Sequence, residues 1–326
     1  MNRTLFTQVM SNMMALATKM RGDTPIGKMS NYEAFTDEIL IRRFGDVKGV
    51  FEMHHFFDII GTDEKPISKE FLDYFDKVCD TINEQFGVFF APKKMKSPHL
   101  ALNFNMKEMH DTKGLYDPSD PNFNKYISIL QPSLYLLNTS YEDAVYITHE
   151  FSKLFCEFGF NVIREKLESC VRGTTGLPAT RDEAFANAID YKKYYEFHIS
   201  IKQTNGEKMN DDDIKRLNSL ISTIQQDLAL RIAFSYNKHH EGQMFINVRC
   251  RTLPSNSCLK LMDYISMRIK ASGEFYVNKI IEEYILYDTF PALDAGWIDS
   301  DKIDIDYIKC AESYALDVVN HHEAKV

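Results

Sequence analysis

The chain has 326 residues, of which 44% are hydrophobic, 13% aromatic and 26% charged. This composition is typical of a folded globular protein and excludes a disordered or fibrous chain. The formal net charge of −9 argues against a surface that grips a nucleic-acid backbone throughout, because such binding needs an excess of Lys and Arg.

The first part of the chain, residues 1–48, is expected to form a helical N-terminal extension. Residues 1–20 have the pattern of an amphipathic helix and contain no continuous apolar run of the kind that a signal peptide or a membrane span needs. We therefore expect a cytoplasmic protein with no membrane partner. Six scattered cysteines without a Cys-x-x-Cys pair predict buried free thiols in a reducing compartment: Cys79, Cys156, Cys170, Cys250, Cys258 and Cys310.

Two alternating segments carry Glu-x-His in the same register. Phe51–Asp58 contains Glu52 and His54, and Tyr195–Lys202 contains Glu196 and His198. Each is predicted to be a strand, and each is followed by a polar stretch and then an amphipathic helix. The two helices begin near Ser68 and near Asn210.

The similarity continues along both halves in the same order. An alternating strand follows each helix, then a second helix and a last strand. The pairs are His99–Asn105 with Phe245–Arg251, Tyr141–Phe158 with Cys258–Lys270, and Phe160-x-Val162-x-Arg164-x-x-x-Glu168 with Phe275-x-Val277-x-Lys279-x-x-x-Glu283. An ordered set of similar blocks predicts an internal duplication.

Each half reads β-α-β-α-β, with room for an extra strand in Tyr126–Leu137. This pattern predicts an α+β protein with two tandem ferredoxin-like (split βαβ) units, each an antiparallel sheet with both helices on one face. The expected domains are the extension 1–48, the first unit 49–171, a linker 172–190, the second unit 191–300 and a C-terminal tail 301–326.

Strand alternation predicts which side chains share the open face of each sheet. Glu52 and His54 fall on this face in the first half, as Glu196 and His198 do in the second. The surrounding polar residues on this face are His99, Ser200, Lys202, Asn247, Arg249 and Arg251. Histidines, carboxylates and arginines around one cleft are suited to proton transfer and to binding an anion.

The ordinary structural role of each histidine stands beside this reading. A half-exposed sheet carries polar residues on its solvent face without any chemical function. His55 falls with the apolar side chains and is expected to be a hydrogen-bonded core histidine. His239-His240 and His321-His322 are expected to be solvent-exposed in a loop and in the tail.

The paired histidine strands resemble those of the two-histidine (2H) phosphoesterases, whose motif is His-x-Thr/Ser once per lobe. His198-Ile-Ser200 matches this motif, whereas His54-His55-Phe56 has Phe56 in place of the hydroxyl. The resemblance implies a metal-independent phosphodiesterase acting on a nucleotide, cyclic nucleotide or RNA end, with His54 and His198 as the acid–base pair and no cofactor. In this hypothesis Glu52 and Glu196 orient the two imidazole rings. Ser200 and either Arg249 or Arg251 hold the phosphate.

A second resemblance rests on Glu283-Tyr-Ile-Leu-Tyr-Asp288, on Leu293-Asp-Ala-Gly-Trp297 and on Tyr195-Glu-Phe-His198. These blocks look like those of a group of bacterial and viral proteins of unassigned function. The resemblance covers most of Tyr195–Trp297 and implies a fold without implying an activity.

Alternatives to catalysis remain open at the level of the sequence. One is a non-catalytic module that sequesters a nucleotide or short RNA through Lys202, Arg249 and Arg251. Another is a metal site, because the imidazoles and carboxylates of the two Glu-x-His strands suit zinc or manganese. A partner-binding surface without chemistry is a further alternative. The sequence does not predict the oligomeric state.

Overall fold

The computed structural model describes residues 3–21, 44–62, 67–87, 99–103, 126–237, 244–294, 298 and 304–324. The chain divides into two compact units. Unit 1 consists of residues 1–100, 128–176 and 285–290, and unit 2 consists of residues 101–127, 177–284 and 291–326. Each unit contains helices and antiparallel strand pairs, so the α+β class predicted from the sequence is confirmed.

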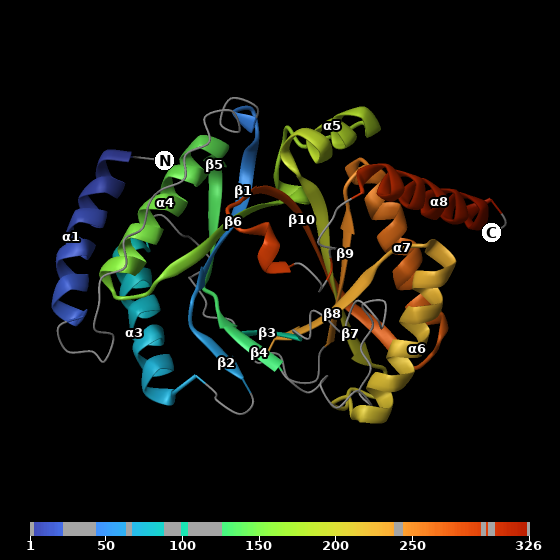
Figure 1. Ribbon diagram of the computed structural model, residues 1–326, viewed down its shortest axis with the longest axis horizontal. Coiled ribbons are helices and arrows are strands. Elements are labelled where there is room, and N and C mark those ends of the chain that lie inside the picture. Colours follow the sequence, from blue (N-terminus) through green and yellow to red (C-terminus); the bar gives the residue numbers. More distant parts are fainter. Residues whose placement is uncertain are drawn as a thin grey trace. The chain divides into compact units, whose positions relative to one another are not determined.

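The sheet of unit 1 is built around β1 (Lys48–Phe57). This strand pairs antiparallel with β5 (Ser133–Ser140) on one side and with β6 (Val162–Cys170) on the other. Two helices, α3 (Lys69–Phe86) and α4 (Tyr141–Glu157), lie on one face of these strands in Figure 1.

The N-terminal helix α1 (Arg3–Arg21) packs on α3 and α4 through one apolar stripe. Four of its side chains are buried there: Phe6, Met10, Met13 and Ala17. The amphipathic helix predicted for residues 1–20 is confirmed, while residues 22–43 of the predicted extension lie outside the described residues.

Aromatic side chains form the core between the helices and the sheet of unit 1. The ring of Phe57 on β1 lies 5.1 Å from the ring of Phe155 on α4 and 5.1 Å from that of Phe160. Phe75 on α3 packs edge-on against Phe57 at 5.7 Å. Rings at these separations and tilts gain favourable quadrupole contacts beyond the burial of their apolar area.

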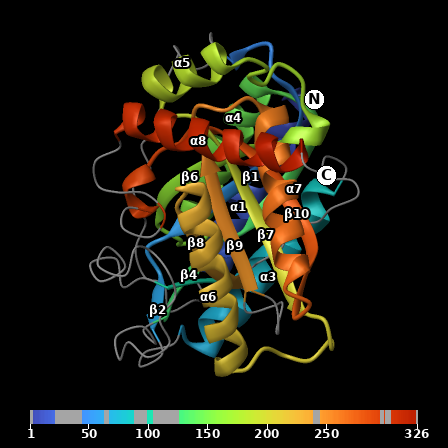
Figure 2. The same ribbon diagram turned by 90° about the vertical axis from the view of Figure 1, so that its right-hand side faces the viewer.

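The largest segment of unit 2 begins at Leu177 and contains the element order β-α-β-β-α-β. Its elements are β7 (Tyr194–Gln203), α6 (Asp211–Leu228), β8 (Ile232–Asn237), β9 (Met244–Cys250), α7 (Ser255–Ala271) and β10 (Phe275–Asp288). The strand order is β8-β9-β7-β10, and α6 and α7 lie together on one face of the strands in Figure 2. This is the connectivity of the split βαβ unit.

Two further helices complete unit 2, namely α5 (Arg181–Tyr191) and α8 (Ile305–Glu323). All of helix α5 except its last residue, Tyr191, lies in the predicted linker 172–190, because Thr180 and Glu183 form a capping box that starts a helix there. Helix α8 forms most of the predicted C-terminal tail and packs on α6 and α7.

One strand match predicted from the sequence is wrong. Strand β5 pairs with the Glu-x-His strand β1, whereas β9 pairs with the Glu-x-His strand β7. The segment predicted for that place contains β3 (His99–Asn103), which is not a neighbour of β1. The predicted extra strand Tyr126–Leu137 is divided into β4 (Tyr126–Leu130) and β5, with Gln131 and Pro132 between them.

Strand β10 contributes to both units. Its first part, Phe275–Tyr284, belongs to unit 2, and its end, Ile285–Asp288, belongs to unit 1. The remaining described elements are the short strand β2 (Ile60–Thr62) and the 3-10 turns η1 (Val171–Gly173) and η2 (Pro291–Asp294).

All six cysteines are free thiols. Burial as predicted is confirmed for Cys79, Cys156, Cys250 and Cys258, but Cys170 is half-buried and Cys310 is exposed. Among the described helices, none combines the length and the apolar character needed to cross a membrane.

The prediction that His55 is a core histidine is confirmed. Its side chain is buried and its Nε2 lies 2.9 Å from the carbonyl oxygen of Thr148. Burial lowers the pKa of His55 from 6.5 to about 4. The ring is therefore neutral in the folded protein at every pH above that range.

We expect His55 to make unit 1 less stable in acid. Below pH 6.5 the unfolded chain takes up a proton at this position and the folded chain does not, so stability falls until the pH approaches 4. Between pH 7 and pH 5 the contribution is about 2 kcal/mol. Urea unfolding at both pH values should show a smaller loss for His55→Leu than for the unsubstituted protein. An equal loss in both would contradict the prediction.

A second stability prediction concerns Glu312 on α8. Its carboxylate accepts hydrogen bonds from the backbone N–H groups of Arg251 and Thr252, at 2.6 and 2.7 Å, where the chain leaves β9. Glu312→Ala leaves two buried donors unsatisfied and should lower the free energy of unfolding by about 2–4 kcal/mol. Denaturant unfolding measures this loss. Glu323→Ala, on an exposed part of the same helix, is the matched control and should have little effect.

Candidate functional site

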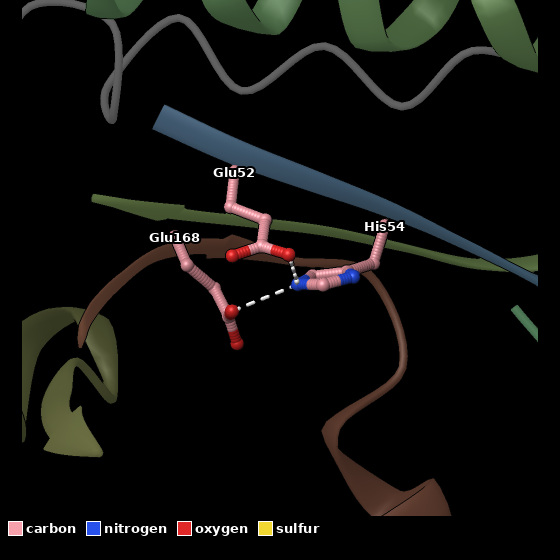
Figure 3. Close-up of side chains that lie close together, drawn as sticks. All are labelled: Glu52, His54 and Glu168. Atoms are coloured by element: carbon pink, nitrogen blue, oxygen red, sulfur yellow. Dashed lines mark hydrogen bonds and ion pairs between the residues drawn. The ribbon is translucent and has the colours of Figure 1, made fainter. Parts of the chain in front are cut away.

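The first candidate site surrounds His54 on β1. His54 Nε2 donates a hydrogen bond to Glu168 Oε2 at 2.9 Å and lies 3.8 Å from Glu52 Oε1. Figure 3 shows both carboxylates turned toward this one ring nitrogen. On the other side of the ring, Nδ1 accepts from Gln131 Nε2 at 2.7 Å and lies 2.8 Å from Ser133 Oγ. We call Glu52, His54 and Glu168 the unit 1 cluster.

Strand register explains how these residues meet. Ser133 on β5 lies directly opposite His54, and Glu168 on β6 lies directly opposite Glu52. Opposite residues of an antiparallel pair project to the same face with their Cβ atoms about 5 Å apart. The cluster therefore follows from the pairing of three neighbouring strands, and no loop is needed to assemble it.

The unit 1 cluster is buried, whereas the sequence analysis predicted an open polar face. Glu52 and His54 are each 7% exposed and Glu168 is 2% exposed. Burial alone would lower the pKa of His54, but the nearby carboxylates of Glu168 and Glu52 outweigh it and raise that pKa. Lys166 opposes this rise and forms an ion pair with the second oxygen of Glu168.

The second candidate site surrounds His198 on β7. Its Nδ1 is hydrogen-bonded to Asn247 Oδ1, and its Nε2 lies 3.1 Å from Glu283 Oε2. Asn247 Nδ2 donates to the carbonyl oxygen of Ala233 at 3.2 Å, so its Oδ1 must face the ring. Since that oxygen can only accept, Nδ1 of His198 carries a proton and Nε2 is the atom that exchanges protons.

Glu196 does not orient His198, contrary to the expectation from the sequence. Its carboxylate accepts a hydrogen bond from Arg249 Nε at 2.8 Å, and Arg249 also contacts Asp294 Oδ2 at 2.7 Å. Arg251 is buried and its guanidinium lies 4.3 Å from the centre of the Tyr194 ring. Both arginines proposed for phosphate binding are thus involved in contacts within unit 2.

The other predicted site residues differ in how far they are exposed to solvent. Ser200 and Asn247 are buried, and Lys202 is half-buried. The side chain of His99 lies outside the described residues, as do His239 and His240. The predicted cleft shared by the two halves stays a prediction.

Four residues that contact the histidines were missed as site residues by the sequence analysis, namely Glu168, Glu283, Gln131 and Ser133. Glu168 and Glu283 close the two aligned motifs of the last strands, and each lies against the histidine of its own unit. Their matching positions in that alignment were the signal that could have found them. Gln131 and Ser133 had no comparable signal, because their strand was matched incorrectly.

The block that resembles proteins of unassigned function has a structural role. Asp288 accepts two hydrogen bonds from the guanidinium of Arg164, at 2.8 and 2.5 Å, and the same guanidinium lies 4.9 Å from the centre of the Phe56 ring. Asp294 binds Arg249. The two aspartates of this block therefore neutralise one buried arginine in each unit.

The protonation of His198 can be tested directly. Nitrogen-15 NMR of the imidazoles near neutral pH should find a proton on Nδ1 of His198, because Asn247 Oδ1 accepts it. Asn247→Ala removes this acceptor and should allow the other tautomer to appear. A spectrum in which Nδ1 of His198 lacks a proton before the substitution would contradict the assignment.

Comparison with known proteins leaves the family of the chain open. No protein-family model and no curated protein matches the sequence. Among solved structures, a candidate chlorite dismutase matches with 8% sequence identity and a TM-score of 0.22, covering 73% of this chain and 94% of the other. A match at this TM-score carries no argument about fold or function.

Proposed function

We propose that the chain is a metal-independent phosphoesterase in which His198 transfers protons to and from a nucleotide, a cyclic nucleotide or an RNA end. The observation that supports this best is the fixed Nδ1–H tautomer of a histidine whose side chain remains 25% exposed. A histidine held in this way presents one exchangeable nitrogen in a constant orientation, as a general acid or base requires.

The proposed chemistry needs one proton to be held near Nε2. Because Nδ1 is already protonated, a proton added at Nε2, which lies 3.1 Å from Glu283 Oε2, makes the ring an imidazolium beside a carboxylate. His198 then donates this proton to the leaving oxygen as water attacks phosphorus and the P–O bond breaks. The proton released by the water returns to Nε2, which restores the starting state.

Lys202 is the proposed phosphate contact. It lies four residues after His198 on the same face of β7 and is half-buried. Arg249 and Arg251 are held by Glu196, Asp294 and Tyr194, so we assign them to the support of the strand.

We also infer that units 1 and 2 are ferredoxin-like units related by duplication. The support is the contact pattern of His54 and of His198. In each unit Nδ1 contacts the residue directly opposite on the neighbouring strand, Ser133 or Asn247. In each unit Nε2 lies beside the glutamate that closes the aligned last-strand motif.

The second candidate function is binding of a nucleotide or short RNA without turnover. It is favoured by Phe56, which stands where the two-histidine motif has a hydroxyl and packs against Arg164 instead. The same surface around His198 and Lys202 would hold the ligand, and no bond would be broken.

Substitution of His198 separates the two functions. If His198 transfers protons, His198→Gln should lower the rate of hydrolysis of a panel of nucleotides, 2′,3′-cyclic nucleotides and short RNAs by about 10²–10⁴-fold. Product formation is followed chromatographically. The matched control is His321→Gln, because His321 is exposed at the end of α8 and should leave the rate unchanged.

Each outcome has a distinct meaning. Calorimetric binding of a panel member without product would support the binding function and reject catalysis. Neither binding nor hydrolysis by the unsubstituted protein would reject both. Equal rates for the unsubstituted protein and His198→Gln would reject His198 as the proton-transfer group.

A further inference from the structure

The unit 1 cluster has the donor set of a metal site. One imidazole nitrogen and two carboxylate oxygens, from His54, Glu52 and Glu168, all lie within 4.8 Å of one another. Figure 3 shows the two carboxylates on β1 and β6 both directed toward Nε2 of the His54 ring. A small cation bound by such atoms at about 2.0–2.2 Å would require Glu52 to move closer and the 2.9 Å contact between His54 and Glu168 to widen slightly.

The two carboxylates of this cluster stand in an arrangement that is unfavourable without a cation. Glu52 and Glu168 are directly opposite one another on β1 and β6, and both are buried. Like charges at opposite positions of an antiparallel pair repel, and burial increases the cost because solvent cannot screen them. Lys166 supplies one positive charge through its ion pair with Glu168.

Glu52 is the carboxylate that lacks a strong partner. Within the described part of the chain, its one ion pair is the 3.8 Å contact with His54, which is longer than a hydrogen bond. The formal charge of two carboxylates and one lysine is −1 when His54 is neutral. A divalent cation at the point where the three ligand atoms converge would compensate Glu52 directly.

Unit 2 shows how the same positions look when no cation is needed. Glu196 corresponds to Glu52, and it is bound by Arg249, which lies directly opposite it on β9. The residue directly opposite Glu52 on β5 is Tyr135. In unit 2 the position opposite the glutamate holds an arginine, whereas in unit 1 it holds a tyrosine. Glu52 therefore has no guanidinium opposite it on β5.

A second observation comes from the far side of the His54 ring. Gln131 Oε1 is buried and has no hydrogen-bond partner within the described part of the chain, while Nε2 of the same amide contacts His54 Nδ1. Turning this amide by 180° lets Oε1 accept a proton from Nδ1. With the proton of His54 on Nδ1, the lone pair of His54 Nε2 faces the two carboxylates. Metal-binding histidines characteristically donate the N–H of their other ring nitrogen to an acceptor such as this amide oxygen.

We propose that unit 1 binds a divalent transition-metal ion, of the class of Zn²⁺ or Mn²⁺, through Glu52, His54 and Glu168. Imidazole and carboxylate ligands suit both ions, and three protein ligands leave a position for water or a further ligand. This proposal does not depend on the proton transfer proposed for His198. Glu168 uses Oε2 as its ligand atom, because Lys166 contacts Oε1.

Isothermal titration of the full chain with ZnCl₂ and with MnCl₂, after chelator treatment, tests the proposal. We expect one ion per chain at this site. Glu52→Gln and His54→Gln should each weaken the binding of the ion by more than about tenfold, because altering a residue that only hydrogen-bonds to a metal ligand already causes a loss of that size. Binding should also raise the melting temperature of the unsubstituted protein, because the ion binds the folded state.

Two matched variants keep the test decisive. His198→Gln changes the corresponding histidine of unit 2 and should leave the affinity unchanged. Tyr135→Arg places a guanidinium opposite Glu52, as Arg249 stands opposite Glu196, and should abolish binding while melting shows a folded protein. It therefore remains informative if Glu52→Gln fails to fold.

Three results would overturn the proposal. One is no saturable binding of either ion by the unsubstituted protein. Another is binding that survives both Glu52→Gln and Tyr135→Arg, which would place the ion elsewhere, for example at His321 and His322 on α8. The last is an equal loss of affinity in His198→Gln and His54→Gln. The hydrolysis assay with His198→Gln gives an independent result, so failure of one idea is distinguishable from failure of the other.

Discussion

The central strands of both units carry charged side chains that are removed from water, and each of these charges needs a partner nearby. A buried ion without compensation costs several kcal/mol, which is a large share of the stability of a domain. Arg164 is neutralised by a bidentate contact with Asp288, and Arg249 lies between Glu196 and Asp294. The order in which strands pair is therefore restricted to arrangements that bring opposite charges together, in addition to burying the apolar face.

The two units differ in how the buried carboxylate of the Glu-x-His strand is compensated. In unit 2 the carboxylate of Glu196 is satisfied by an arginine on the next strand, which leaves His198 between an amide and Glu283. In unit 1 the corresponding carboxylate, Glu52, has only the distant contact with His54 among the described residues. The residue opposite the carboxylate on the neighbouring strand, Arg249 in unit 2 and Tyr135 in unit 1, distinguishes the proposed proton-transfer site from the proposed cation site.

Alternation and helix periodicity were sufficient to predict the Glu-x-His strands and the helices that begin after Ser68 and Asn210. They also predicted that His55 faces the core. They were not sufficient to predict strand order, because the residue pattern of β5 resembles that of any half-buried strand, and a strand's neighbour is determined by contacts distant in sequence. The partners of both histidines lie on neighbouring strands. Because the strand next to β1 was predicted incorrectly, the contact between Ser133 and His54 was not predicted.

Strand β10 has a consequence for the synthesis of the chain. Residues 285–290, which include the end of β10, complete unit 1, although the rest of that unit precedes Leu177. Arg164 consequently has no aspartate beside it until more than a hundred further residues have been added. During translation, unit 1 emerges from the ribosome with an uncompensated guanidinium and an unfilled sheet edge, and unit 2 must be nearly complete before that edge is closed. A protein truncated before β10 would lose part of both units, so the two halves of the sequence are not separable at the linker.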